Sequence, residues 1–417
     1  MAWIGFCFIL CSMSCNKEKL RQPFLPPLPM DTIHSKLTIL WQKPLTADTI
    51  ECGGHAHFIW NDNVLFSTSF TAPNVNVEMR NGANGYLQWR FNNFSKVVGD
   101  FTPSQSLINV RHTTIMNSWG HVYCVDNQTG HQLWSSTVPD PGGGEPSIHG
   151  IGDYIYACHF SGGKPATISE SLVRSHYLSG HWDTLITFQP RQGGMYLNIA
   201  PPTFWINPGG DTILIIRNSI SLQPSINGQS QTADLFAFNL RTRQLEWQLD
   251  DFDTRGVSPE GQPLISGNRL FFCGYKTLHC IDLINGNTLW SKYFEGGIEP
   301  SVVEHQNMVI VQSSWIGMWG LDKNTGNTVW HNEDTDGSAS VLQYYDGIVY
   351  FTSTGYARLY AIDCSNGKTI WGENSPNRPN PKTSHASFGW QGVVIDPQRK
   401  VLYTTDKYYA MCIKLPE

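Results

Sequence analysis

The chain has 417 residues, of which 15% are charged and 12% aromatic, and it contains 38 glycines and 24 prolines. This composition favours many short aromatic strands joined by turns over long charged helices, and no long stretch repeats apolar residues at the helical period. The net charge is −6, and Lys and Arg do not gather in any one stretch. We therefore expect no nucleic-acid partner.

The first fourteen residues, MAWIGFCFILCSMS, are almost wholly apolar and too short to span a bilayer. We interpret residues 1–14 as a secretory signal. Ser14 and Cys15 resemble the cleavage box of bacterial lipoproteins, and a lipid on Cys15 would be the only membrane anchor. The alternative is an ordinary secretory peptide in which Cys15 has no special role. Residues 15–36 include the run PFLPPLPM and are expected to form an extended tether.

From Leu37 onward the chain repeats one stretch, most clearly LDKNTGNTVW at residues 321–330. Near-copies end at Trp134, Trp290 and Trp371, each with Gly four residues before the Trp. This pattern predicts a tight turn between two strands, in which the Gly takes a positive φ and the Trp ring packs between neighbouring sheets. The stretch superficially matches a calcium-binding loop, but its strand-like alternation favours the turn.

Each unit is predicted to contain four strands, and the Trp residues of the last three copies are 40 and 41 residues apart, close to the length of a propeller blade. The tryptophans assigned to the repeat are Trp41, Trp89, Trp134, Trp247, Trp290, Trp330 and Trp371. The glycines assigned to it are Gly85, Gly130, Gly180, Gly286, Gly326 and Gly367. Two copies are degenerate, because Thr184 replaces the Trp of the third unit and Arg243 replaces the Gly of the fourth.

Two insertions disturb the rhythm of the third and fourth units. Residues 189–201 bridge these units, and residues 219–234 interrupt the second hairpin of the fourth. Insertions in a repeat array are expected to form loops, often on the binding face. The alternative is that both insertions are disordered and have no binding role.

The two ends of the repeat array complete each other. The C-terminal stretch GVVIDPQRKVLYTTDKYYAMCIKL supplies three strands without a fourth, whereas residues 37–45, LTILWQKPL, form an isolated fourth strand. Pairing these strands closes a ring and removes an exposed sheet edge. We therefore predict an all-β fold, a single eight-bladed β-propeller over residues 37–417.

Seven cysteines follow Cys15, namely Cys52, Cys124, Cys158, Cys273, Cys280, Cys364 and Cys412. An odd number leaves at least one thiol unpaired in an exported protein. Cys273 and Cys280 share one predicted hairpin, but the register places Cys273 opposite Leu278. We therefore predict buried thiols at these two positions rather than a disulfide.

Spacing, Gly, Trp and ring closure together resemble the quinoprotein-like, or PQQ-like, β-propeller family over residues 37–415. Quinone-dependent dehydrogenases of this superfamily hold a quinone and Ca²⁺ in the central funnel, and many have a disulfide between adjacent cysteines. This chain has no adjacent cysteine pair and no CxxCH haem-attachment motif. We therefore expect no cofactor and no metal. In those enzymes the cofactor carries the chemistry, so we also expect no catalytic residues.

Polar residues recur where the chain enters the inner strands, namely Glu51, His55, Glu145, Glu260, Glu299 and His385. In a propeller they would gather at one mouth of the central channel, where an acidic rim would bind a cation or a basic segment of a partner. The alternative is a solvated loop face. His55 and His57 share one face of a predicted strand, as metal ligands could, although hydrogen bonding within a blade interface is the simpler interpretation.

Taken together, these features resemble the propeller-forming lipoproteins of the outer-membrane β-barrel assembly machinery. The resemblance implies a non-catalytic scaffold that is exported, anchored through Cys15, and docked onto a protein partner as a monomer within a complex. The degenerate fourth unit is the expected docking position. The alternatives are a surface-exposed propeller that binds protein or glycan, and a quinone-dependent enzyme.

Overall fold

The computed structural model divides into two compact units, Met1–His34 and Ser35–Glu417, and all described residues belong to the second. Every regular element among these residues is a β-strand. No helix in this described part could cross a membrane. The described residues are 36–46, 52–68, 75–94, 107–118, 120–139, 148–158, 170–188, 194–226, 229–253, 263–313, 316–337, 340–353, 355–378, 380, 385–389 and 392–416.

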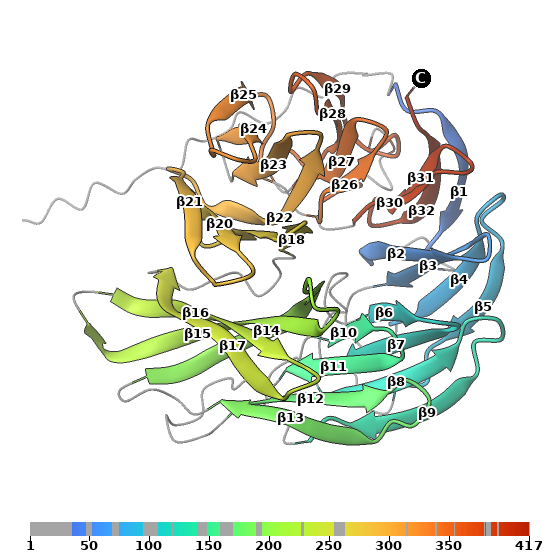
Figure 1. Cartoon of the computed structure of the whole chain (residues 1–417). Helices are drawn as coiled ribbons and strands as arrows, with labels where there is room; N and C mark the ends of the chain where they lie inside the picture. The colour runs from blue at the N-terminus through green and yellow to red at the C-terminus, as the bar shows by residue number, and fades with distance from the viewer. Residues whose placement is uncertain are drawn as a thin grey trace, which may run out of the picture. The chain divides into compact units, whose positions relative to one another are not determined.

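Eight four-stranded antiparallel sheets form the eight blades of a propeller ring (Figure 1). Blade 1 contains β2 (Gly54–Trp60), β3 (Asn63–Thr68), β4 (Val77–Asn81) and β5 (Leu87–Phe91). Blade 2 contains β6 (Leu107–Val110), β7 (Thr113–Ser118), β8 (His121–Asp126) and β9 (Gln132–Thr137). Blade 3 contains β10 (Ile148–Ile151), β11 (Tyr154–Cys158), β12 (Glu170–His176) and β13 (Trp182–Phe188). Blade 4 contains β14 (Gly194–Ile206), β15 (Thr212–Ile226), β16 (Gln229–Asn239) and β17 (Gln244–Asp253).

The second half of the ring repeats this plan. Blade 5 contains β18 (Leu264–Ser266), β19 (Arg269–Cys273), β20 (Thr277–Asp282) and β21 (Thr288–Tyr293). Blade 6 contains β22 (Ile298–His305), β23 (Met308–Ser313), β24 (Gly317–Asp322) and β25 (Thr328–Asn332). Blade 7 contains β26 (Gln343–Tyr345), β27 (Ile348–Thr352), β28 (Leu359–Asp363) and β29 (Thr369–Glu373). Blade 8 contains β30 (Val394–Asp396), β31 (Val401–Thr405), β32 (Tyr409–Lys414) and β1 (Ile39–Pro44).

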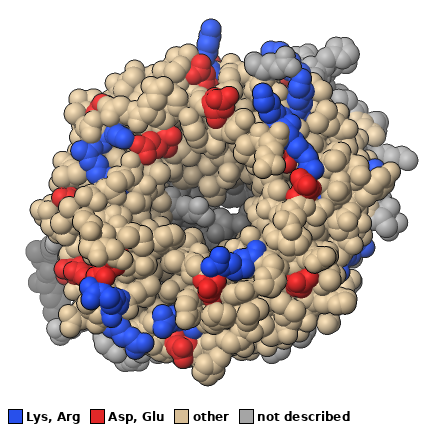
Figure 2. Space-filling model, turned by 45° about the vertical axis from the view of Figure 1, so that its right-hand side comes forward, with Lys and Arg blue, Asp and Glu red and all other residues tan. Residues whose placement is uncertain are grey.

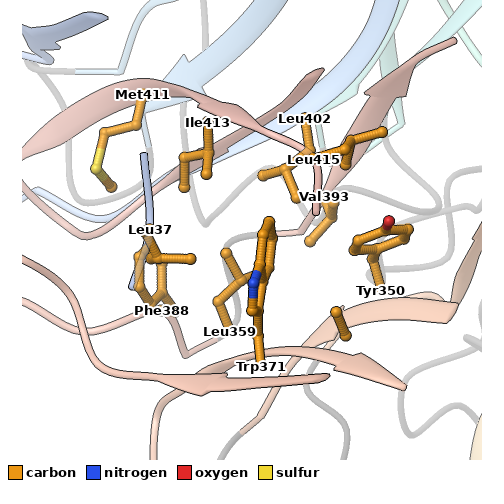
Figure 3. Packing of buried hydrophobic residues seen from close by; sticks show 11 residues of the cluster. Leu37, Tyr350, Leu359, Trp371, Phe388, Val393, Leu402, Met411, Ile413 and Leu415 are labelled. Atoms are coloured by element: carbon orange, nitrogen blue, oxygen red, sulfur yellow. The ribbon is translucent and has the colours of Figure 1, made fainter. Parts of the chain in front are cut away.

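Blade 8 is built from opposite ends of the chain, as the sequence predicts. β1 pairs antiparallel with β32, with Trp41 opposite Cys412 and Pro44 opposite Tyr409. Figure 3 shows Leu37, which precedes β1, in the same apolar cluster as Trp371 of blade 7. The N-terminal segment therefore both completes a sheet and packs against the neighbouring blade.

The apolar core is divided among the eight blade interfaces. Each cluster of buried side chains takes residues from two neighbouring blades, as Val77 of β4 and Met116 of β7 illustrate for blades 1 and 2. Both faces of a blade are covered in this way, so consecutive residues of the middle strands are buried, as Val309, Ile310 and Val311 of β23 illustrate. Burial of apolar surface between blades is thus the main force that holds the ring together.

The prediction that the two insertions form loops is wrong for their described residues. Residues 194–201 belong to β14, and the second insertion lengthens the hairpin of β15 and β16, with Ser221 opposite Gln231. Strand pairing satisfies the backbone N–H and C=O groups, which a long loop must satisfy otherwise. The strands of blade 4 are consequently 10 to 15 residues long.

Six cysteines, Cys52, Cys124, Cys273, Cys280, Cys364 and Cys412, are buried and form no disulfide with one another, which confirms the prediction for Cys273 and Cys280. Cys273 faces Leu278 as expected, and the side chain of Cys158 lies outside the described residues. Cys124, Cys280 and Cys412 lie opposite repeat tryptophans, where blades 4 and 7 have alanine. Burial raises the pKa of Cys124 and Cys412 to about 12 and that of Cys280 to about 11. These thiols stay protonated at neutral pH and act as small apolar packing residues.

Candidate functional site

Only two of the six residues predicted at the channel mouth have described side chains. His55 is buried in β2, whereas His385 is exposed. Glu299 is described only as part of the backbone of β22. Glu51, Glu145 and Glu260 lie outside the described residues, as does the proposed lipidation site, Cys15. The gathering of these six residues at one mouth therefore stays a prediction.

His55 and His57 lie close together on β2 but have different surroundings. Their ring centroids are 6.2 Å apart, and His57 Nε2 lies 2.7 Å from Ser67 Oγ of β3. β2 bulges between Ala56 and Phe58, which disturbs the regular alternation of its side chains. Across the described ranges, no three His, Cys, Asp or Glu side chains gather as metal ligands would.

Charged side chains are scattered over the face of the propeller that Figure 2 shows. Lys and Arg lie beside Asp and Glu around a central hollow, and neither sign dominates the described surface in this view. Among the ion pairs of the described residues, Arg399 Nη2 lies 3.1 Å from Asp62 Oδ1. Charge alone therefore does not mark a binding surface on this face.

Repeat tryptophans reach across to the turn of the next blade, an arrangement that we call the Trp–Gly lock. Trp330 Nε1 donates to the carbonyl of Cys364 at 2.9 Å, and a Cβ on Gly367 would overlap the Trp330 ring. The same two contacts join Trp41 to Gly85, Trp89 to Gly130, Trp134 to Gly180, Trp247 to Gly286 and Trp290 to Gly326. The Gly is thus required for its positive φ and for the space that the ring occupies.

The turn of the lock is held by its first residue. Asp322 Oδ1 accepts hydrogen bonds from the backbone N–H groups of Asn324 and Thr325, both at 2.9 Å. Burial alone would raise the pKa of Asp322, but hydrogen bonds from Thr325 and Asn324 lower it overall. The stretch joins the paired strands β24 and β25, which confirms a hairpin turn at this position.

Two of the eight described interfaces lack the lock. Trp371 faces blade 8, whose outer strand β1 comes from the N-terminal segment and follows no such turn. Between blades 3 and 4, Thr184 stands opposite Val173, and Arg243 holds the turn at a φ of 58°. The two degenerate copies in the sequence are therefore the two halves of one missing lock.

Aromatic and aliphatic side chains fill the interface between blades 3 and 4 instead. The ring centroids of Phe188 and Phe236 lie 5.0 Å apart, within a cluster that spans both blades. Blade 4 also exposes large apolar side chains on both of its edge strands: Phe204 and Ile206 on β14, which we call the fourth-blade surface, and Leu245 on β17. The blade with the longest strands thus combines a missing lock with apolar groups exposed on its inner strand.

Residues 231–389 match the family model described as outer membrane protein assembly factor BamB. These residues lie within the eight-bladed propeller. The match covers less than half of the chain, from β16 of blade 4 to the segment after blade 7. No curated protein sequence matches the chain.

Solved structures of similar fold include proteins with different activities. BamB from Moraxella catarrhalis superposes with a TM-score of 0.61 at 13% identity, covering 91% of this chain and 100% of BamB. A europium-containing methanol dehydrogenase gives a TM-score of 0.59 at 11% identity, covering 89% of this chain and 84% of the enzyme. Sqt1 from Saccharomyces cerevisiae gives 0.64 at 10% identity, covering 92% and 100%. At such identities these likenesses establish the fold and leave the activity open.

Proposed function

We propose that this protein is a non-catalytic scaffold that binds other proteins and assists the assembly of outer-membrane β-barrel proteins. In this proposal it is exported, carries a lipid on Cys15, and works as a monomer within a larger complex. The observation that carries the proposal is the match of residues 231–389 to the BamB family model. The full coverage of the BamB structure is consistent with it, because nothing of that propeller is missing from this chain.

We assign the docking surface to the fourth-blade surface. The interface of blades 7 and 8 also lacks a lock, but only blade 4 combines a missing lock with strands of 10 to 15 residues. Apolar side chains that remain exposed in the isolated chain become buried when a partner covers them, which supplies binding energy.

An affinity pull-down from detergent-solubilised membranes tests the proposal. We expect the wild-type protein to recover subunits of the barrel-assembly machinery. Ile206→Asp should abolish recovery, because it places a charge in a surface that a partner covers. The matched control is Ile284→Asp in the turn between β20 and β21, because Ile206 and Ile284 are 52% and 57% exposed.

Two results would contradict the proposal. Recovery of no barrel-assembly subunit by the wild-type protein would remove the assembly function. If both variants lost the barrel-assembly subunits equally, or if neither lost them, the docking surface would not lie on blade 4. The proposed assembly function would still stand.

The methanol dehydrogenase likeness keeps a quinone-dependent enzyme as the second candidate. An absorbance spectrum and a metal analysis of the purified protein separate the two candidates, since the enzyme would carry a quinone and Ca²⁺. Protease treatment of intact cells separates a periplasmic scaffold from a surface-exposed propeller that binds protein or glycan.

A further inference from the structure

The Trp–Gly locks divide the ring into two halves of four blades each. Three locks join blades 8, 1, 2 and 3 to one another, and three join blades 4, 5, 6 and 7. The two interfaces without a lock, between blades 3 and 4 and between blades 7 and 8, lie four blades apart and thus on opposite sides of the ring (Figure 1). Each half is therefore held together by contacts that its two borders lack.

The interface between blades 7 and 8 has hydrogen bonds in place of a lock. The backbone N–H of Lys36 donates to Glu373 Oε2 at 3.3 Å, and the Tyr345 hydroxyl donates to the carbonyl of Pro397 at 3.3 Å. Leu37 is buried in the apolar cluster of the same interface. Directional bonds and the N-terminal segment thus keep these two blades joined.

The interface between blades 3 and 4 is held by apolar contacts. Within the part of the chain that the structure describes, no hydrogen bond or ion pair joins these two blades. At least one hydrogen bond crosses each of the other seven interfaces. Leu172 and Phe188 of blade 3 meet Ile216 and Phe236 of blade 4 in one cluster. Apolar contact is non-directional, so it fixes the relative position of two blades less tightly than a hydrogen bond does.

A displaced β-bulge accounts for the missing lock. In every locked blade the bulge in the outer strand directly precedes the repeat Trp, as it does before Trp134. In blade 3 the bulge comes after Thr184, and such a shift reverses the face that the preceding side chains occupy. Trp182 of β13 accordingly packs backward, and its indole N–H donates to Ser136 Oγ of blade 2 at 3.0 Å. The large aromatic ring of this strand therefore strengthens the contact of blade 3 with blade 2 and not its contact with blade 4.

The interface between blades 3 and 4 also buries an amide. Asn218 comes two residues after Ile216 on β15, so the two side chains share one face of the strand. Asn218 is 0% exposed, and neither its Nδ2 nor its Oδ1 has a hydrogen-bond partner among the described residues. A buried polar group without a partner destabilises the closed state, whereas opening of the interface would let water reach it.

We propose that the propeller opens reversibly between blades 3 and 4. Blades 8, 1, 2 and 3 move as one rigid body and blades 4 to 7 as the other, because three locks hold each half together. The interface between blades 7 and 8 is the hinge, since its hydrogen bonds remain in place. Such an opening exposes the cluster around Ile216 without breaking the sheet of any blade. This inference does not rest on the proposed scaffold function and would survive its failure.

The test compares thiol labelling on the two faces of β15. Ile215 and Ile216 are consecutive and both 0% exposed, but Ile216 packs toward blade 3 and Ile215 toward blade 5. Full-length Ile215→Cys and Ile216→Cys proteins are treated with N-ethylmaleimide in native buffer, and the labelled peptides are quantified over time by mass spectrometry. Each rate is divided by the rate of the same thiol in concentrated urea. We expect Ile216→Cys to react at least about tenfold faster than Ile215→Cys, which lies behind a locked interface.

The dependence of the labelling rate on urea separates opening from unfolding. The rate of Ile216→Cys should depend weakly on urea, because opening exposes little surface, whereas that of Ile215→Cys should follow global unfolding. If a melting curve shows that either protein does not fold, Leu214→Cys and Ile213→Cys replace them, because Leu214 packs toward blade 3 and Ile213 toward blade 5. Equal rates within a pair, a faster rate on the face toward blade 5, no labelling at either position, or equally steep urea dependence would overturn the proposal.

Discussion

Removal of residues 1–46 will open the ring and abolish cooperative folding, whereas removal of residues 1–35 will leave the melting temperature unchanged. The longer deletion removes β1 and with it the partner of β32. It also removes Leu37, Trp41 and Leu45, which are buried at the interfaces of blade 8. Each such side chain stabilises the fold by about 1.5–3 kcal/mol.

The expected loss exceeds about 5 kcal/mol, which approaches the whole stability of a typical domain. It is larger than the burial of three side chains suggests, because β32 becomes an unpaired edge that can recruit other chains. Trp41 also donates to the carbonyl of Gly82 in blade 1 at 2.8 Å, so the deletion breaks the Trp–Gly lock between blades 8 and 1.

Thermal unfolding followed by circular dichroism, with size-exclusion chromatography at several concentrations, measures both effects. The protein that lacks residues 1–35 is the control, because it starts at Lys36 and keeps every described strand. A sharp transition at the same temperature in both truncated proteins would show that closure by β1 does not stabilise the ring.

Gly367→Ala will destabilise the protein far more than Gly267→Ala, although both glycines have a positive φ. Their φ angles are 74° and 59°. A Cβ at position 267 meets nothing within 4 Å, so this variant reports only the backbone cost, about 1 kcal/mol. A Cβ at position 367 overlaps the Trp330 ring, and overpacking raises the expected cost to about 3 kcal/mol.

A double-mutant cycle with Trp330→Ala isolates the contact between ring and glycine. Trp330→Ala alone should cost about 3–5 kcal/mol, because it leaves a cavity between blades 6 and 7. In that background Gly367→Ala should cost only about 1 kcal/mol, since the overlapping ring is gone. Urea unfolding of the four proteins gives the coupling energy, and additive effects would mean that the Trp–Gly lock is not a stabilising unit.

Much of the fold was predictable because the residues of each repeat favour its turns and strands locally. A Gly four residues after Asp322, Asp363 and Asp126 marks a turn by its backbone conformation. The strands on either side follow from the alternation of apolar residues. The register of Cys273 with Leu278 followed by counting from that turn. The insertions in blade 4 were misjudged because polar alternating residues suit an extended hairpin as well as a loop, and pairing of the backbone decides between them.

The candidate sites were less predictable, because they depend on contacts between blades. Thr184 and Arg243 are nearly 60 residues apart, and nothing local in the sequence indicates that they are halves of one lock.

By itself the sequence determined the number of blades, the position of the repeat turns marked by glycine, and the strand that closes the ring, because these follow from local backbone preferences and the spacing of apolar residues. The tertiary structure decided which neighbouring blade each Trp contacts and which interfaces lack the Trp–Gly lock. It also explains why the Gly partner cannot carry a side chain. Those properties arise only when rings and turns from successive blades occupy the same space, and packing of that kind has no signature within a single repeat.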